Sequence, residues 1–442
     1  MTQPAPQLPA EVWSHVFGYL SAADKFSVRT ACKYFKKLVD HGSLWKDWSV
    51  VLGYHKGYYN SPFWGTLRRR KVTSVVLRGT RTKDLERLAS SLPTLTTVVM
   101  DQSSQASLSF LKECTHLKRL AIRGSGTPLL LDGSTVYEPL QLTHLSMCDV
   151  KLPTIAGCSL ISAVLPFPNL TSLVYHKARL SENTLWQDTL WMVHVPSILT
   201  RLPMLKHLSL SVGYTLCTFH NRSRPSPGPP GGDGASVLSS LELIDCTHSF
   251  EADAMKRMPG LKRLAVFHRY SHHQMPLGLL ATDGGDLKTW LRDLSQLSTL
   301  VIVKGPPVKK YVTSIPDTVT SLTLCVAGLS PQDMEAVSVQ VPNLLHLHID
   351  PWPSHLRAQA AQIPQLFPKL KSLKLRHEHV SERDFLQLHQ LKDLEYLEIL
   401  DIRPHLSELT RKLQALTNFR LQVTTSPRKR DVLTCPCVCQ LN

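Results

Sequence analysis

The sequence predicts an α/β solenoid: a short three-helix module, then stacked strand–helix repeats whose parallel strands line the concave face of a horseshoe. Three observations predict this fold. One apolar motif recurs 14 times along the chain. Within each copy the apolar residues alternate, as in a strand with one buried face. Ahead of the first copy, about forty residues carry apolar side chains at helical spacing instead.

The recurring motif is an apolar residue, two others, an apolar residue, one other and an apolar residue, the pattern L-x-x-L-x-L. Successive copies begin 22 to 36 residues apart, mostly within the roughly 20 to 29 residues of leucine-rich repeats. We therefore predict about 14 leucine-rich repeats over residues 72–421. The copies begin at Val72, Leu95, Leu117, Leu142, Leu170, Leu205, Leu238, Leu261, Leu297, Val319, Leu344, Leu370, Leu394 and Leu416.

Segments between the copies predict helices on the outer side. Residues 82–89 and 381–386 each carry acidic residues in the first turn and apolar residues three or four apart. A single strand–helix unit cannot bury its apolar face, whereas stacked units share a continuous core and leave the strand face open. The repeats therefore predict an extended binding surface.

The helical module and the repeats divide the chain into four parts. Residues 8–48 form the helical module, 49–71 a linker, 72–421 the repeats and 422–442 a flexible, basic, cysteine-rich tail. Residues 222–234, RSRPSPGPPGGDG, predict a disordered insertion because the motif resumes at Leu238. The long interval between Tyr175 and Leu205 predicts an enlarged convex helix.

The helical module has three expected helices. In the first, Pro9 suits the helix start, and an apolar stripe follows. Ser21 with Asp24 can cap the second helix, in which Phe26 and Val28 are expected to point inward. About forty residues cannot hide all of this apolar surface, so a partner is expected to cover the rest. The remaining apolar positions are Val12, Trp13, Val16, Phe17 and Leu20 in the first helix, Cys32, Phe35 and Leu38 in the third, and the closing Leu44 and Trp45.

The module resembles the F-box motif at its usual spacing. The residues that carry the resemblance are Leu8-Pro9, Glu11-Val12, Val16-Phe17, Tyr19-Leu20, Asp24, Cys32 and Leu44-Trp45. One departure is Lys33-Tyr34-Phe35, where that family usually has arginines and tryptophan. With the repeats that follow, the chain resembles the F-box and leucine-rich-repeat protein family over nearly its whole length.

The resemblance implies a function. In that family the F-box docks on a Skp-type adaptor, which hangs from a cullin carrying a RING subunit, and the repeats bind the protein to be ubiquitylated. The chain would then be the substrate-recognition subunit of an SCF-type ubiquitin ligase, without catalytic residues or a cofactor of its own. The implied adaptor contacts are Leu8, Pro9, Val12, Val16, Phe17 and Leu20, with Val16 and Leu20 shared with the module's own core.

Residues flanking the last two apolar positions of each copy are expected on the concave face. Basic residues exceed acidic ones there, which favours an acidic or phosphorylated target, although ordinary solvated charges remain an equal alternative. The candidate target contacts are Arg119, Arg123, Arg263, Phe267, His346, His348, Lys374, Arg376 and Tyr396; Arg78 and Arg420 are further basic positions, and Asp101, Glu242, Asp350 and Glu398 are the acidic ones.

Composition and motifs limit the other functions. The net charge of +16 leaves open a nucleic-acid-binding surface, although aromatic residues interleaved with the basic ones are sparse. Phosphate-loop, dinucleotide, nucleophile-elbow and zinc-protease motifs are absent from the sequence. His268, His272 and His273 are expected in a surface loop, so no metal site is predicted.

The tail suggests a location. Cys439-Gln440-Leu441-Asn442 resembles a prenylation box, and Cys435 and Cys437 could supply a second lipid. We expect a cytoplasmic protein, with nuclear location from the basic runs 68–71 and 428–430, or peripheral membrane attachment, as alternatives. A leucine-rich-repeat scaffold without ubiquitin transfer is the other open hypothesis.

Overall fold

The structure, a computed structural model, describes residues 8–45, 48–53, 59–101, 108–124, 131, 133–150, 159–176, 195–211, 236–246, 255–268, 285–326, 328–351, 356–378, 380–401 and 406–426. These residues form two compact units, which divide between residues 170 and 171. The expected insertion at 222–234 and the cysteines of the tail lie outside the described residues, as do residues 177–194 of the interval in which a convex helix is expected.

The first unit begins with the expected three-helix module. Its helices are α1 (Ala10–Gly18), α2 (Ala22–Ala31) and α3 (Lys33–Val39), followed by the 3-10 helix η1 (Gly42–Trp45). The predicted cap is confirmed, because Ser21 Oγ accepts a hydrogen bond from the Asp24 backbone N–H at 3.2 Å. Cys32 caps α3 in the same way, with its Sγ accepting from the Phe35 N–H at 3.3 Å.

The repeats of the first unit start earlier than the sequence suggested. Strand β1 (Ser49–Gly53) pairs in parallel with β2 (Ser74–Arg78), and α4 (Ser61–Arg69) lies between them in the chain. Residues 49–71, predicted as a linker, are therefore the first repeat. The prediction was wrong because valines fill the strand and Trp64 and Leu67 fill the helix, so the leucine motif is not visible there. The unit continues with α5 (Thr82–Ser91), β3 (Thr97–Asp101), η2 (Leu108–Glu113), β4 (Arg119–Arg123), η3 (Pro139–Gln141), β5 (His144–Cys148) and α6 (Ser159–Val164).

The second unit repeats the same arrangement. Its strands pair in parallel and in chain order from β6 to β15. The predicted helix at 381–386 is confirmed, since Ser381 caps α12 by accepting from the Asp384 N–H. The elements are β6 (Ser172–His176), α7 (Val195–Arg201), β7 (His207–Ser211), β8 (Ser240–Cys246), β9 (Arg263–His268), α9 (Gly285–Arg292), β10 (Thr299–Val303), η5 (Val308–Lys310), η6 (Val312–Ser314), β11 (Ser321–Cys325), α10 (Pro331–Gln340), β12 (His346–Ile349), η7 (Arg357–Gln362), α11 (Ile363–Leu366), β13 (Ser372–Leu375), α12 (Glu382–Leu386), η8 (Gln387–Gln390), β14 (Tyr396–Ile399), α13 (Leu406–Leu416) and β15 (Gln422–Thr425).

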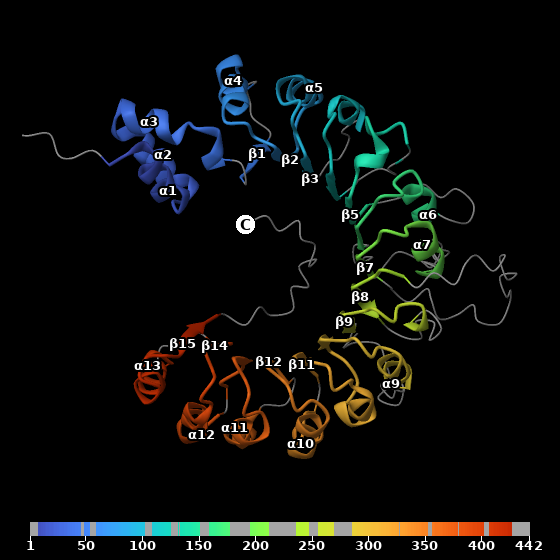
Figure 1. The fold of residues 1–442 in the computed structure, drawn as a ribbon, viewed down its shortest axis with the longest axis vertical. Coiled ribbons are helices and arrows are strands. Elements are labelled where there is room, and N and C mark those ends of the chain that lie inside the picture. The colour runs from blue at the N-terminus through green and yellow to red at the C-terminus, as the bar shows by residue number, and fades with distance from the viewer. Residues whose placement is uncertain are drawn as a thin grey trace, which may run out of the picture. The chain divides into compact units, whose positions relative to one another are not determined.

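The core lies between strands and helices in each unit. The second and fourth residues of the strands before β15 point into it, as Leu120 and Ile122 do in β4 with 1% and 0% exposure. Figure 1 shows α4 and α5 on one side of β1–β3, and α9–α13 on one side of the later strands. The first, third and fifth strand positions face away from the helices. We call the sheet face that they form the open face.

The last predicted copy of the motif is displaced. Helix α13 continues to Leu416, and Asn418 and Phe419 have positive φ angles of 51° and 56°. Strand β15 then pairs with β14 so that Val423 lies opposite Leu397. The predicted apolar positions Leu416 and Phe419 are 51% and 72% exposed. The repeats therefore extend to residue 425, into the range predicted as tail.

Candidate protein-interaction surfaces

Helix α1 carries an exposed apolar stripe. Leu8, Val12, Val16 and Tyr19 are 45%, 42%, 42% and 80% exposed. Their spacing of three or four residues places them along one side of a helix. We call these four residues the α1 stripe. Apolar surface gathered in this way on a small module indicates a docking site for another protein.

The module's own core is filled from the opposite side of α1. Phe17 is 2% exposed and packs with Val39, Leu44 and Trp45, while Trp13 lies against this cluster. The Trp13 and Phe17 rings are 5.5 Å apart. Because the core is complete without the α1 stripe, the stripe is free to contact a partner.

The structure separates the six predicted adaptor contacts. Leu8, Pro9, Val12 and Val16 are exposed, whereas Leu20 is half-buried and packs against the core cluster. Phe17 is a core residue, because residues 13, 17 and 20 share the inward side of α1. Val16 belongs to the surface alone, so the expectation that it is shared with the core is wrong, while that for Leu20 agrees with its burial.

Two exposed aromatic residues were missed. Tyr19 is 80% exposed and its ring meets that of His15 edge-on at 5.1 Å. Tyr34, at the start of α3, is 36% exposed. The signal for Tyr19 was present in the sequence, since it follows Val16 by three residues on the same helix side. Both rings add apolar area to the surface of the module.

Lys25 occupies the inward position that was expected for Phe26. Its side chain is 1% exposed, and its Nζ donates a hydrogen bond to the Leu44 carbonyl at 3.2 Å and lies 4.6 Å from the centre of the Trp48 ring. Burial lowers the pKa of this amine. The prediction for Phe26 was wrong: it is 49% exposed and lies 5.6 Å from Trp45, ring to ring.

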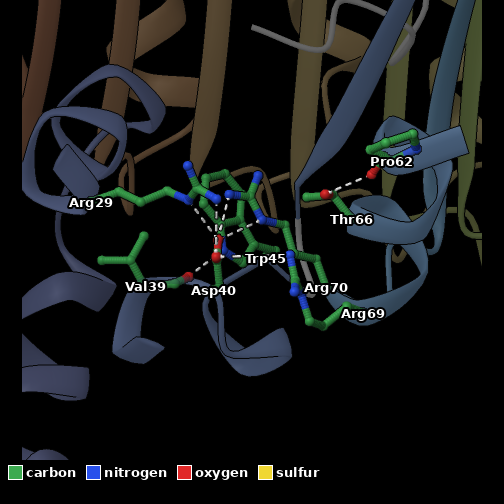
Figure 2. A network of polar contacts seen from close by, with 8 residues as sticks. All are labelled: Arg29, Val39, Asp40, Trp45, Pro62, Thr66, Arg69 and Arg70. Carbon is green, nitrogen blue, oxygen red and sulfur yellow. Dashed lines mark hydrogen bonds and ion pairs between the residues drawn. The ribbon is translucent and has the colours of Figure 1, made fainter. Parts of the chain in front are cut away.

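The helical module is tied to the first repeat by one carboxylate. Asp40, at the end of α3, accepts from Arg29 of α2 at 2.8 Å and from Arg70, which follows α4, at 2.7 Å (Figure 2). The Arg70 guanidinium also lies 4.0 Å from the centre of the Trp45 ring. We call Arg29, Asp40, Trp45 and Arg70 the joint.

Electrostatics within the joint favour the charged carboxylate. Burial by itself would raise the pKa of Asp40, but the hydrogen bonds and positive charges of Arg29 and Arg70 outweigh it and lower the pKa. Arg68, in the same basic run, donates to the Ser91 carbonyl at 3.1 Å, at the end of α5. Arg70 of the run 68–71 is buried, whereas Arg68, Arg69 and Lys71 are exposed, so the nuclear signal stays a prediction.

On the open face of the first unit, some charges are paired and others are not. Arg78 and Asp101 form an ion pair at 3.3 Å. Arg119, at the start of β4, is exposed. Arg123, at the end of β4, has a buried Nε without a hydrogen-bond partner. Val76, Val99 and Ala121 form an apolar row between them at the third strand positions.

On the open face of the second unit, two of the predicted basic residues are neutralised, whereas Arg263 is exposed and forms no ion pair among the described residues. Lys374 pairs with Glu398 at 2.9 Å, and Arg376 pairs with Asp350. Ser426 also donates to Glu398, and although burial would raise the pKa of this carboxyl, these hydrogen bonds hold it below its ordinary value. Lys374 and Arg376 therefore have little free charge for a target.

The other candidate target contacts are spread over several strands, with His346 and His348 two residues apart on β12. Burial lowers the pKa of His348 to about 4, so it is neutral near pH 7. Tyr396 bonds its hydroxyl to Thr424 at 2.8 Å. Arg263 and His346 are exposed at first strand positions, Phe267 is half-buried at a fifth position, Glu242 is buried, and Arg420 lies before β15 and donates to the Leu391 carbonyl.

Among the described residues, no group of three or more histidine, cysteine, aspartate or glutamate side chains could hold a metal ion. No helix in the described ranges is long and apolar enough to span a membrane. The candidate lipidation sites Cys435, Cys437 and Cys439, and the loop histidines 272 and 273, lie outside these ranges.

A comparison with protein-family models agrees with the F-box resemblance of the helical module. Residues 5–49 match the F-box-like family model. No curated protein sequence matches the chain. Among solved structures, the TLR13–ssRNA13 complex is 17% identical with a TM-score of 0.37, covering 86% of this chain and 47% of that one. An internalin, inlF of Listeria monocytogenes, is 13% identical with a TM-score of 0.35, covering 94% of both chains.

This chain thus spans less than half the length of the TLR13 chain. Because both TM-scores are low, the assignment of the repeat fold rests on the strand order and register of each unit. The amino-terminal module is an F-box-like domain, and the strand–helix units after it form a leucine-rich-repeat solenoid. Together they make the chain a protein-interaction module.

Proposed function

We propose that this F-box and leucine-rich-repeat protein is the substrate-recognition subunit of an SCF-type ubiquitin ligase. In this proposal the α1 stripe docks on a Skp-type adaptor, which links the chain to cullin and RING subunits, and the open face of the repeats binds the target. The observation that carries the proposal is the α1 stripe itself, an exposed apolar surface on an F-box-like domain whose own core is already filled.

In this proposal the chain contributes to ubiquitin transfer by positioning the target protein, and it performs no chemical step itself. A target held on the repeats would have its lysines close to a charged conjugating enzyme, which raises their effective concentration without an acid, base or nucleophile from this chain. The joint supports this role, because it fixes the F-box-like domain to the first repeat through a shielded carboxylate and two guanidinium groups.

The test is adaptor binding by the full chain. Val12→Asp with Val16→Asp places charge on the α1 stripe, and the matched control is Val339→Asp, on α10, where the valine is 81% exposed. Interface anchors are each worth about 1 to 4 kcal/mol, so we expect the double variant to bind purified adaptor about a hundredfold more weakly. The control should bind as the wild type does.

The outcomes separate the hypotheses. Equal adaptor affinity in the wild type and the double variant would show that the α1 stripe is not the docking site. A wild type that binds adaptor but recovers neither cullin nor RING subunits would favour the scaffold hypothesis. Unchanged circular dichroism of the variants shows that lost binding is not lost folding.

A further inference from the structure

On the open face of the first unit, Arg119 and Arg123 form no ion pair with a carboxylate of the described residues. Three of the basic residues predicted there, Arg78, Lys374 and Arg376, pair with Asp101, Glu398 and Asp350. Among the described residues, the guanidinium groups of Arg119 and Arg123 make no hydrogen bond or ion pair, and the Arg123 Nε is shielded from solvent. We call Arg119 and Arg123 the arginine pair.

The arginine pair has a defined spacing. The two residues are the first and fifth of β4, and odd positions of a strand share one sheet face. Four steps of roughly 3.3 Å place their Cα atoms about 13 Å apart. Ala121 lies between them and is continuous with Val99 and Val76 across the neighbouring strands.

We propose that the arginine pair binds an extended segment of the target protein with acidic residues at positions i and i+4 and a small or apolar residue at i+2. An extended segment repeats at the same interval as β4, so its residues i and i+4 match the two guanidinium groups. The residue at i+2 then faces Ala121. This inference rests on the proposed function, whose target-binding surface it specifies.

The pattern of charge argues for a carboxylate-bearing peptide. An unpaired guanidinium is a donor array for carboxylate or phosphate. A nucleic acid would present a continuous phosphate chain, yet Asp101 stands at the fifth position of the neighbouring strand, opposite Arg123. The apolar row Val76, Val99 and Ala121 offers no aromatic ring on which a base could stack.

The apolar row contributes little to the affinity for the bound segment. Val76, Val99 and Ala121 are 6%, 4% and 9% exposed, so they present little area to a ligand. Affinity must then come mainly from the two charged contacts. It should fall as salt is added, because exposed charges are screened within about 10 Å at 0.1 M ionic strength.

The experiment measures fluorescence anisotropy of labelled peptides with the full chain. The probe carries the core Glu-Thr-Val-Thr-Glu between glycine–serine flanks, and the control peptide replaces both glutamates by glutamine. Arg119→Gln with Arg123→Gln is compared with Lys83→Gln and Lys112→Gln. These two lysines are exposed on α5 and η2 of the same unit, so the control removes the same charge from another face.

We expect the wild type to prefer the glutamate peptide, and the arginine double variant to lose about tenfold in affinity for each arginine removed. The lysine control should keep wild-type affinity. Equal loss in both double variants, or equal binding of both peptides, would overturn the inference. So would tighter, arginine-dependent binding of a single-stranded oligonucleotide, which would identify nucleic acid as the ligand.

Adaptor binding is measured on the same preparations. The arginine double variant should bind the adaptor as the wild type does, since the α1 stripe is unchanged. Retained adaptor binding without any peptide preference would reject the acidic-segment inference alone. If the wild-type chain itself does not bind the adaptor, the proposed function is rejected.

Discussion

Replacing Asp40 by asparagine should loosen the joint while leaving the repeats folded. The change removes the charge that neutralises Arg29 and Arg70 and leaves one oxygen to accept from them. Breaking a fully buried ion pair costs about 3 to 5 kcal/mol. The side chains of Arg29, Asp40 and Arg70 are 27%, 10% and 7% exposed, so we expect about 2 to 3 kcal/mol.

The assay is amide hydrogen exchange of the full chain by mass spectrometry. A loss of 2 to 3 kcal/mol corresponds to exchange about 30- to 150-fold faster wherever opening requires the joint to break, in α2, α3 and α4. Peptides from α10 should be unaffected. The control is Glu382→Gln, which breaks an exposed ion pair with Lys412 and should change nothing measurable.

The pH dependence gives an independent check. The folded pKa of Asp40 lies below its ordinary value of 3.8, so its ionisation stabilises the fold above that pH, and the contribution is lost as the pH falls through the folded pKa. The difference in stability between wild type and Asp40→Asn should therefore be full near pH 7 and shrink below about pH 4. Unchanged exchange in α2 and α4 at pH 7 would refute the reasoning.

Three further predictions concern individual residues. Phe17→Ala should cost the module about 3 to 5 kcal/mol, because a buried ring is lost, measured by urea unfolding; a cost below 1 kcal/mol would show that Phe17 is a surface contact after all. The exposed Cys32 should react with iodoacetamide at pH 8 well before Cys114, because burial raises the pKa of Cys114 to about 12. Mass spectrometry of the labelled peptides measures which cysteine reacts first, and equal labelling would contradict the prediction. Gly328→Ala should cost about 1 kcal/mol of thermal stability through its positive φ alone, since its Cβ would meet no atom; no change in melting temperature would contradict this.

The buried lysine shows how the small domain holds together. Lys25 has no carboxylate among its contacts and instead bonds to a carbonyl and lies against the Trp48 ring. A cation over an aromatic face is partly compensated for its lost hydration. The domain therefore uses its indole rings both as core and as partners for the positive charges of Lys25 and Arg70.

The sequence alone determined the repeats and the amino-terminal module. The L-x-x-L-x-L spacing fixed which residues are buried in the strands, because every second strand residue faces the core, and thirteen of its copies coincide with strands β2 to β14. The F-box resemblance rested on adjacent residues in one short segment, and residues 5–49 bear it out. Local periodicity was sufficient for these conclusions.

Tertiary structure decided what those residues contact. Periodicity could not show that Lys374 and Arg376 are neutralised, because their partners Glu398 and Asp350 lie more than twenty residues away. It could not show which side of α1 packs inward, since both the side of Phe17 and the side of Val16 carry apolar residues and only the packing in space distinguishes them. Long-range pairing left Arg119 and Arg123 as the unneutralised charges of β4, and such pairing depends on strand register in space.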